Sequence, residues 1–166
     1  MEVFNTIPSA SIRTNAPSFI KPVLVAIDLR LGSDKLVVWA SEYANAINAP
    51  LAIVHIVHDP ASSPGFYSNS PYAKQPLEPL ELVAERMMKS LLSKVTADYP
   101  DLSSLLNVSA YLISGLPKTR IGEVAEKLNA QMLVIGREKQ SDLVRFLKGS
   151  ITSYVVKKSK VEIAVI

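Results

Sequence analysis

A glycine-serine pair is the local feature of this 166-residue chain whose residue types and placement are best suited to chemistry. Gly149 and Ser150 stand directly before a segment whose apolar residues recur at helical spacing. Glycine lets the backbone approach an anion, and the first turn of the following helix offers unpaired N–H groups and the positive end of a dipole. The Ser150 hydroxyl adds a donor, although a serine at this place can equally be an ordinary helix cap. The pair therefore indicates either an anion site or a simple helix start.

The charge distribution favours the anion site. Residues 137–160 hold seven basic and two acidic side chains, whereas the whole chain has a net charge of only +3. Clustered basic side chains raise the local concentration of anions, so this segment suits a ligand that carries phosphate. The modest net charge of the whole chain does not predict nucleic-acid binding.

Other kinds of reaction centre find no support in the sequence. There is no cysteine, which excludes disulfide scaffolds, thiolate metal sites and cysteine nucleophiles. Neither a Walker A motif nor a Gly-x-Gly-x-x-Gly motif occurs, which disfavours P-loop hydrolysis and dinucleotide oxidoreduction. His55 and His58 stand three apart at the end of an expected strand; in a strand, positions three apart point to opposite faces, so the pair is not expected to share a metal. We therefore expect no catalytic residues and no metal ligands, and an acyl- or phosphoryl-transfer enzyme would lack a visible catalytic set.

The elements that position these residues alternate along the chain. Five apolar runs rich in β-branched residues are typical of strands buried on both faces: 22–28, 50–57, 106–113, 131–135 and 161–166. Between them, apolar residues recur at helical spacing over 33–48, 80–98, 117–129 and 150–158. Strands that alternate with amphipathic helices predict an α/β fold, with a parallel sheet covered by helices on both faces.

Several local details follow from the same pattern. Ser33 is suited to cap the first helix. Residues 1–20 show no period and are rich in Ser, Thr, Asn and Pro, which predicts a flexible tail before one domain over residues 21–166. The proline-rich stretch 58–79 predicts a long loop. The second helix is expected to turn one stripe inward: Leu80, Val83, Ala84, Met87, Leu91 and Val95.

The carboxyl ends of the expected strands carry the remaining candidate residues. Ligands of open parallel sheets bind beyond these ends, where the strand order reverses. Asp28 ends the first strand, Ile56 lies near the end of the second, and Gly115 and Gly136 follow the third and fourth. We expect these residues to lie along one cleft.

Together these motifs resemble the universal stress protein family. The resemblance is carried by the runs VLVAID and IVHIV, by Gly115-x-Pro117 and by the spacing from Gly136 to Gly149-Ser150, and it covers residues 21–166. It implies a three-layer Rossmann-like domain of the adenine nucleotide alpha hydrolase-like type. Its five-stranded parallel sheet would have the order 3-2-1-4-5, with the strands numbered along the chain.

The resemblance also implies a function. It suggests binding of ATP or AMP, with or without Mg²⁺, by a regulatory homodimer that acts in the stress response, with at most slow ATP hydrolysis. The two copies would pair through residues 161–166, whose edge is otherwise exposed. The site residues that the resemblance implies are Asp28 facing the adenine, Ile56 near adenine and ribose, Gly115 lining the pocket, Ile135 and Gly136 along the ribose and phosphate path, and Gly149, Ser150 and Ile151 at the phosphate.

One position departs from the family's nucleotide-binding signature. That signature is Gly-x2-Gly-x9-Gly followed by Ser or Thr, and here it reads Gly136-x2-Lys139-x9-Gly149-Ser150. Lys139 can crowd a backbone that should approach phosphate, or it can supply a cation to that phosphate, and the sequence leaves both open. The alternative function is a module that has lost nucleotide binding and acts through protein–protein contacts. With no secretory leader and no long apolar run, we expect a cytoplasmic protein without membrane insertion.

Overall fold

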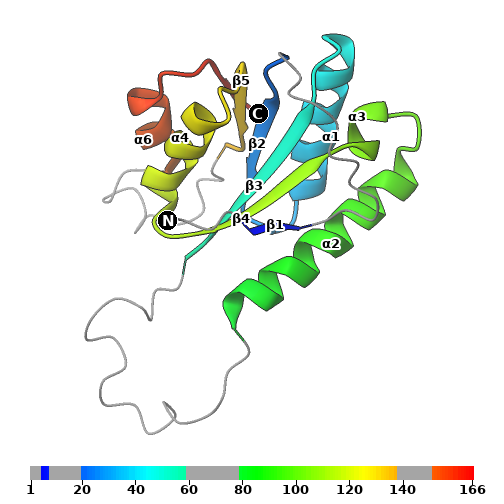
Figure 1. Ribbon diagram of the computed structural model, residues 1–166, viewed down its shortest axis with the longest axis horizontal. Helices are drawn as coiled ribbons and strands as arrows, with labels where there is room; N and C mark the ends of the chain where they lie inside the picture. The colour runs from blue at the N-terminus through cyan, green and yellow to red at the C-terminus, as the bar shows by residue number, and fades with distance from the viewer. Residues whose placement is uncertain (1–4, 8–19, 59–78, 138–150) are drawn as a thin grey trace, which may run out of the picture.

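The computed structural model describes residues 5–7, 20–58, 79–137 and 151–166, which form a sheet covered by helices on both faces (Figure 1). Within these residues the sheet has six strands in the order β1-β4-β3-β2-β5-β6. The strands are β1 (Asn5–Ile7), β2 (Val23–Ile27), β3 (Leu51–Val57), β4 (Ser109–Ser114), β5 (Met132–Ile135) and β6 (Ile163–Val165). The five strands from β2 to β6 are parallel, so the expected order 3-2-1-4-5 is confirmed.

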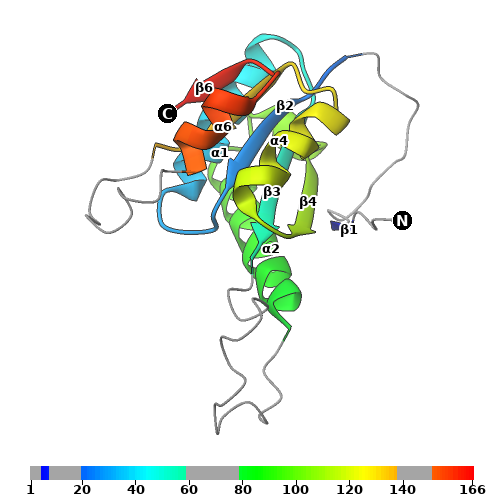
Figure 2. The same ribbon diagram turned by 90° about the vertical axis from the view of Figure 1, so that its left-hand side faces the viewer.

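The strand β1 was not predicted. It pairs antiparallel with β4 and extends the sheet by one edge strand (Figure 2). Its three residues lie in the segment expected to be a flexible tail, and three residues are too few to show the alternation by which strands are recognised. Pairing with a partner about a hundred residues further along the chain is a tertiary contact that local pattern does not reveal.

Helices cover the two faces of the sheet separately. Figure 1 shows α1 (Ser33–Ala46), α2 (Leu80–Asp98) and α3 (Ser103–Leu106) on one side, and α4 (Pro117–Lys127) and α6 (Ile151–Lys158) on the other. The central strand β2 is buried at all five positions, and its side chains alternate between the two cores. Val23, Val25 and Ile27 pack toward α1 and α2, while Leu24 and Ala26 pack toward α4 and α6. The near-continuous apolar run is thus explained by burial on both faces.

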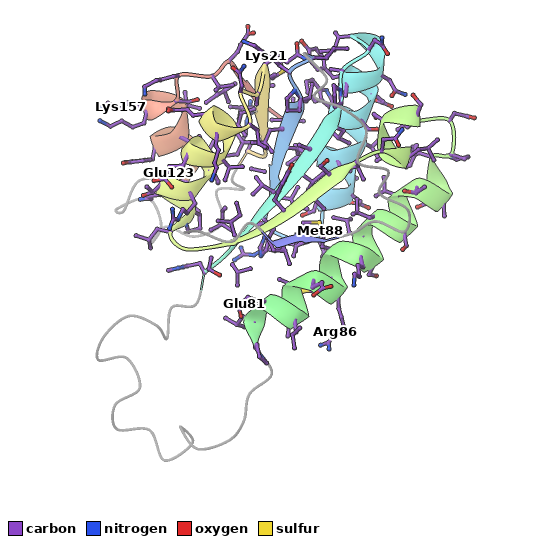
Figure 3. All side chains as sticks on the ribbon, viewed as in Figure 1. Lys21, Glu81, Arg86, Met88, Glu123 and Lys157 are labelled. Carbon is purple, nitrogen blue, oxygen red and sulfur yellow. The ribbon has the colours of Figure 1, made fainter. Side chains whose placement is uncertain are left out.

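The inward face of α2 differs from the expected stripe. Ala84, Met88 and Val95 are its buried residues, whereas Met87 is 45% exposed and Leu80 is 43% exposed. In Figure 3 Met88 lies on the side of α2 that faces the sheet. The first turns of α2 extend beyond the ends of the strands, so apolar side chains there have no sheet to cover them (Figure 1). Apolar residues at helical spacing do not distinguish such a projecting turn from a packed one.

The start of α1 also differs from expectation. Its N-cap is Gly32, which has a φ of 99°, and no side chain caps the helix. Ser33 is the first helical residue, and its hydroxyl donates to Oδ1 of Asp28 at 3.2 Å instead of to a helix N–H group. The left-handed backbone at Gly32 is accessible because glycine has no Cβ. The serine therefore organises the loop that follows β2.

The short helix α3 replaces the beginning of the expected third strand, which starts at Ser109 and not at residue 106. Its first turn is bound by Asn45 of α1, whose Oδ1 accepts hydrogen bonds from the Ser104 N–H at 2.8 Å and from the Ser103 hydroxyl at 3.2 Å. The hydroxyls of Ser104 and the fully buried Ser41 lie 2.5 Å apart. The N–H group at the start of α3 is bonded by a side chain nearly sixty residues away in the sequence. Local sequence pattern therefore did not predict this helix.

Part of the sequence-based interpretation falls outside the described residues. This holds for the loop over residues 59–78 and for Lys139, Gly149 and Ser150. None of the helices in the described ranges is long and apolar enough to cross a membrane.

Candidate functional site

The carboxyl ends of β2 and β5 form the centre of the candidate site. The two strands are hydrogen-bonded neighbours, and Ala26 pairs with Ile135. Asp28 and Gly136 follow these strands directly, so the parallel register places them at one edge of the sheet. The chain continues from β2 to β3 on one side and reaches β5 on the other, so the strand order reverses here. Such a point is where open α/β sheets bind ligands.

The carboxylate of Asp28 organises the loop between β2 and α1. Its Oδ1 accepts hydrogen bonds from the Arg30 N–H at 3.0 Å and from the Ser33 hydroxyl at 3.2 Å. Its Oδ2 has a longer contact, 3.7 Å, with Nε of Arg30, and the side chain is 66% exposed. One oxygen therefore holds the loop, while the other faces solvent and is available to accept a hydrogen bond from a ligand.

Leu29 holds this loop in an unusual conformation. Its φ of 59° lies in the left-handed region, which a bulky side chain rarely adopts. The side chain packs against the core formed with α1 and α2. Strain of this kind persists only where the surroundings enforce it, and it concentrates at functional sites. Here it turns the chain so that the Arg30 N–H reaches Asp28.

Gly136 lies opposite this loop, between α1 and α6. A Cβ added there would be 3.5 Å from Cδ2 of Leu36, which is an ordinary contact distance. Its φ lies outside the left-handed region. Its carbonyl accepts a hydrogen bond from the Thr152 hydroxyl of α6 at 3.0 Å. Among the described residues, neither the backbone conformation nor a crowded Cβ position requires glycine here.

Gly115 has a different explanation. Its φ is +139°, and an added Cβ would lie 2.9 Å from Nε of Arg120. Its N–H donates to the Val57 carbonyl at 3.0 Å, which joins the carboxyl ends of β3 and β4. The turn itself therefore requires glycine, and the residue type alone is no sign of a ligand.

The three isoleucines among the expected site residues contribute little side-chain surface. Ile56 and Ile135 are 7% and 5% exposed and belong to the core between the sheet and α4 and α6. Ile151 is half-buried at the start of α6 and packs against the same core. A ligand at this edge would meet mainly the backbone of these residues.

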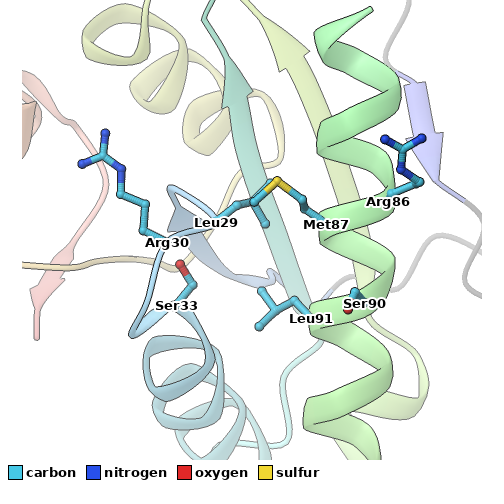
Figure 4. A pocket seen from close by; sticks show the side chains of 7 residues that line it. All are labelled: Leu29, Arg30, Ser33, Arg86, Met87, Ser90 and Leu91. Carbon is cyan, nitrogen blue, oxygen red and sulfur yellow. The ribbon is translucent and has the colours of Figure 1, made fainter. Parts of the chain in front are cut away.

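None of the expected site residues lines either of two hollows in the described part of the surface. One of about 420 Å³ lies between the β2–α1 loop and α2 (Figure 4), beside Asp28, and its lining residues are Leu29, Arg30, Ser33, Arg86, Met87, Ser90 and Leu91. The other, of about 430 Å³, is lined by residues such as Pro22 and Pro50 at the opposite edge of the sheet. We place the candidate site by strand ends and glycine geometry, because the segment expected to complete it, residues 138–150, is not described.

His55 lies near the same edge, at the end of β3. Its Nδ1 donates to the Ile27 carbonyl at 3.0 Å, so the neutral ring keeps Nε2 as an acceptor. Burial lowers the pKa of His55 below its usual value of 6.5, although the hydrogen bond to Ile27 and the charge of Asp28 oppose that shift. In the described residues no group of acidic and histidine side chains is placed to hold a metal.

The lowered pKa of His55 predicts a pH dependence of stability. The unfolded chain takes up a proton near pH 6.5, whereas the folded protein keeps the ring neutral to lower pH. The free energy of unfolding is therefore fully retained above that value and falls as the pH drops toward the pKa of the folded state. His55→Asn, which keeps an N–H donor but does not titrate, should remove this fall in urea unfolding between about pH 7.5 and pH 5.5. His58→Asn is the control that should retain it, and an unchanged fall in His55→Asn would contradict the assignment.

Sequence reasoning missed some of the residues that shape this edge. Arg30 and Ser33 contact Asp28, and Thr152 contacts Gly136. An aspartate often accepts a hydrogen bond from the N–H two residues further on, so the Arg30 contact had a sequence signal. The contact between Thr152 and Gly136 had none, since it depends on how α6 docks.

Comparison with known proteins identifies the family of this chain. A family model described as the universal stress protein family matches residues 20–166. The chain belongs to the universal stress protein family. It is 28% identical over 128 residues to universal stress protein A homolog 1 of Coxiella burnetii, a match that covers 76% of this chain and 83% of that protein. A universal stress protein of Mycobacterium tuberculosis is 29% identical over 146 residues, covering 87% of this chain and 47% of the relative. This family member thus spans about half the length of the mycobacterial protein.

Solved structures share the fold of this universal stress protein domain. A universal stress protein crystallised in complex with cAMP has a TM-score of 0.63 and 19% identity, covering 90% of this chain and 98% of that one. The protein from Archaeoglobus fulgidus in complex with dAMP has a TM-score of 0.60 and 18% identity, covering 90% and 99%. At these identities the likeness concerns the fold.

Proposed function

We propose that this universal stress protein domain binds an adenine nucleotide, ATP or AMP, at the carboxyl edge of β2 and β5 and acts as a regulatory domain in the stress response. The observation that carries the proposal is Gly136. This glycine has neither a left-handed backbone nor a crowded Cβ position among the described residues, and it lies across the strand-order reversal from Asp28. Close approach of the ribose or phosphate of a ligand to the Gly136 backbone accounts for a glycine at this position.

The proposed roles combine the site residues expected from the sequence with the contacts at the strand ends. Oδ2 of Asp28 accepts a hydrogen bond from the exocyclic amino group of adenine, because Oδ1 is already used by the loop. Gly136 admits the ribose and phosphate path. The phosphates bind at the start of α6, where Ile151 begins the helix, together with Gly149, Ser150 and Lys139 of the preceding segment. Mg²⁺ would accompany ATP. The proposal is supported by the adenine nucleotides, cAMP and dAMP, in the named complexes of two proteins with this fold.

Calorimetric titration tests the proposal. The protein is titrated with AMP, ATP and cAMP, and with GMP as the control for base recognition. We expect saturable binding of at least one adenine nucleotide and weaker binding of GMP, whose carbonyl cannot donate to Asp28. If no adenine nucleotide binds at millimolar concentration, the nucleotide proposal is wrong, and the protein-interaction alternative stands.

The C-terminal strand carries a second proposal, a homodimer through residues 161–166. In the described sheet β6 is an edge strand that pairs with β5, and Glu162 and Ile166 make the backbone bonds to it. Residues of a strand alternate in the edge toward which their N–H groups point, so the N–H groups of Ile163 and Val165 face the open edge. An open edge of this kind is a template for pairing with a second copy.

Replacing Val165 by proline should separate the two copies. Proline removes an outward N–H group but no bond within the protomer, and edge strands tolerate it for that reason. Sedimentation analysis should give a dimer for the wild-type protein and for the control Val165→Thr, and a monomer for Val165→Pro with an unchanged circular dichroism spectrum. A monomeric wild-type protein, or a dimeric Val165→Pro, would rule out pairing through this edge.

A further inference from the structure

The backbone of Arg30 is fixed by a hydrogen bond, whereas its side chain is exposed. Its backbone N–H is fixed to Oδ1 of Asp28 at 3.0 Å, and the neighbouring Leu29 is packed into the core. The side chain is 65% exposed, and its Nε lies 3.7 Å from Oδ2 of Asp28, which is beyond hydrogen-bonding distance. In Figure 4 the guanidinium points away from α2 and from Met87 and Leu91. The loop thus projects a cation from the rim of the candidate site.

Arg30 can offset the repulsion between negative charges at the candidate site. A nucleotide that binds at this edge brings its negatively charged phosphates into the same site as the Asp28 carboxylate, and like charges repel. Arg30 is the cation that the structure places beside Asp28. If its guanidinium moves to a phosphate, it gives up a long ion pair in exposed surroundings, which is worth little. It gains charge-assisted hydrogen bonds that guanidinium forms in pairs with phosphate oxygens.

Three other described cations are less suited to this role. Arg120, beside Gly115, donates to Glu123 at 2.8 Å. Lys94 of α2 donates to Asp34 at 2.9 Å, and this contact lowers the pKa of Asp34. Arg86 of α2 lines the hollow between α2 and the β2–α1 loop, but in Figure 4 its guanidinium points away from Leu29 and Arg30. Of these four cations, Arg30 is the one whose side chain is exposed and whose backbone is hydrogen-bonded to Asp28.

We propose that Arg30 binds the phosphate group of the ligand and lets this domain distinguish a nucleotide from its nucleoside. This inference rests on the proposed function, since it assigns one part of the same ligand to one side chain. It predicts that Arg30 contributes to the binding of AMP and ATP and not to the binding of adenosine.

The test compares Arg30→Gln and Arg30→Lys with the wild-type protein in titrations with adenosine, AMP and ATP. Arg30→Gln should weaken AMP and ATP about tenfold or more, leave adenosine unchanged, and reduce the loss of AMP affinity as salt is raised. The AMP and ATP affinities of Arg30→Lys should lie between those of the wild-type protein and Arg30→Gln, because lysine keeps the charge but not the paired donors. Lys35→Gln, which removes an exposed positive charge from the first turn of α1, is the matched control and should match the wild-type protein. Equal melting temperatures verify that each variant is folded.

The outcomes separate this inference from the proposed function. If the wild-type protein binds AMP and Arg30→Gln binds it equally well, the phosphate assignment is wrong and the nucleotide function stands. If Arg30→Gln weakens adenosine as much as AMP, Arg30 acts on the base or on the loop, and the assignment is also wrong. If the wild-type protein binds none of the three compounds, the proposed function fails and this inference fails with it.

Discussion

Gly136→Ala should bind AMP at least about tenfold more weakly than the wild-type protein, a loss of about 1.4 kcal/mol or more, while remaining equally stable or becoming more stable. The expected stability follows from the backbone: the φ of Gly136 is not left-handed, and the new Cβ would make an ordinary 3.5 Å contact with Leu36. Replacing such a glycine restricts the unfolded chain and stabilises by about 0.4–1 kcal/mol. The binding loss follows because the methyl group occupies the space through which we propose that the ligand approaches. Calorimetric titration and urea unfolding measure the two effects.

Two other glycines serve as matched controls for this prediction. Gly122 lies within α4 with nothing within 4 Å of an added Cβ, so Gly122→Ala should stabilise by up to about 1 kcal/mol and leave AMP binding unchanged. Gly115→Ala should instead lose about 1–3 kcal/mol of stability, because its φ of +139° is strained for alanine and the Cβ would displace Arg120. If Gly136→Ala binds AMP like the wild-type protein, Gly136 is not part of the ligand path, and the observation that carries the proposed function is lost.

Met88→Ala should destabilise the fold by about 2–5 kcal/mol, whereas Met87→Ala should cost less than about 1 kcal/mol. The two methionines are adjacent in α2, but Met88 is fully buried against the sheet and Met87 is 45% exposed. Truncating Met88 removes its burial and leaves a cavity in a packed core, while truncating Met87 leaves water where water already reaches. Urea unfolding of the two variants measures the difference. Equal losses in both variants would mean that α2 packs in a different rotation from the one described.

The secondary structure could be predicted well because burial on both faces is a local property of composition. A strand such as β2, whose five residues all pack into one core or the other, must be apolar at successive positions, and this is visible in the sequence. The helix α2 was predicted over Leu80–Asp98, as observed. Which of its apolar residues face inward depends on where the helix crosses the sheet edge. For that reason Met87 was expected to be buried and Met88 is the residue that packs.

The candidate site was predictable only in outline. The resemblance to the family supplied the strand order, and the ends of the expected strands supplied Asp28 and Gly136. The parallel pairing of β2 with β5 brings these two strand ends together. The assignment of roles to Ile56 and Ile135 stays a prediction, and the structure shows that their side chains are in the core. Lys139, Gly149 and Ser150 lie outside the described residues, so the effect of the lysine in the signature also stays a prediction.

The sequence by itself therefore determined the alternation of strands and helices and the residue types at the strand ends, because these depend on local composition and on the spacing of apolar residues. Only the tertiary structure decided at which position the backbone requires glycine. Gly115 has a left-handed φ and Gly136 does not, but the two residues are indistinguishable in the sequence. The tertiary structure likewise decided which oxygen of Asp28 is free, because its partners, Arg30 and Ser33, are set by the turn at Leu29. Conformation and hydrogen-bond partners arise from packing between segments, and residue spacing along the chain does not encode them directly.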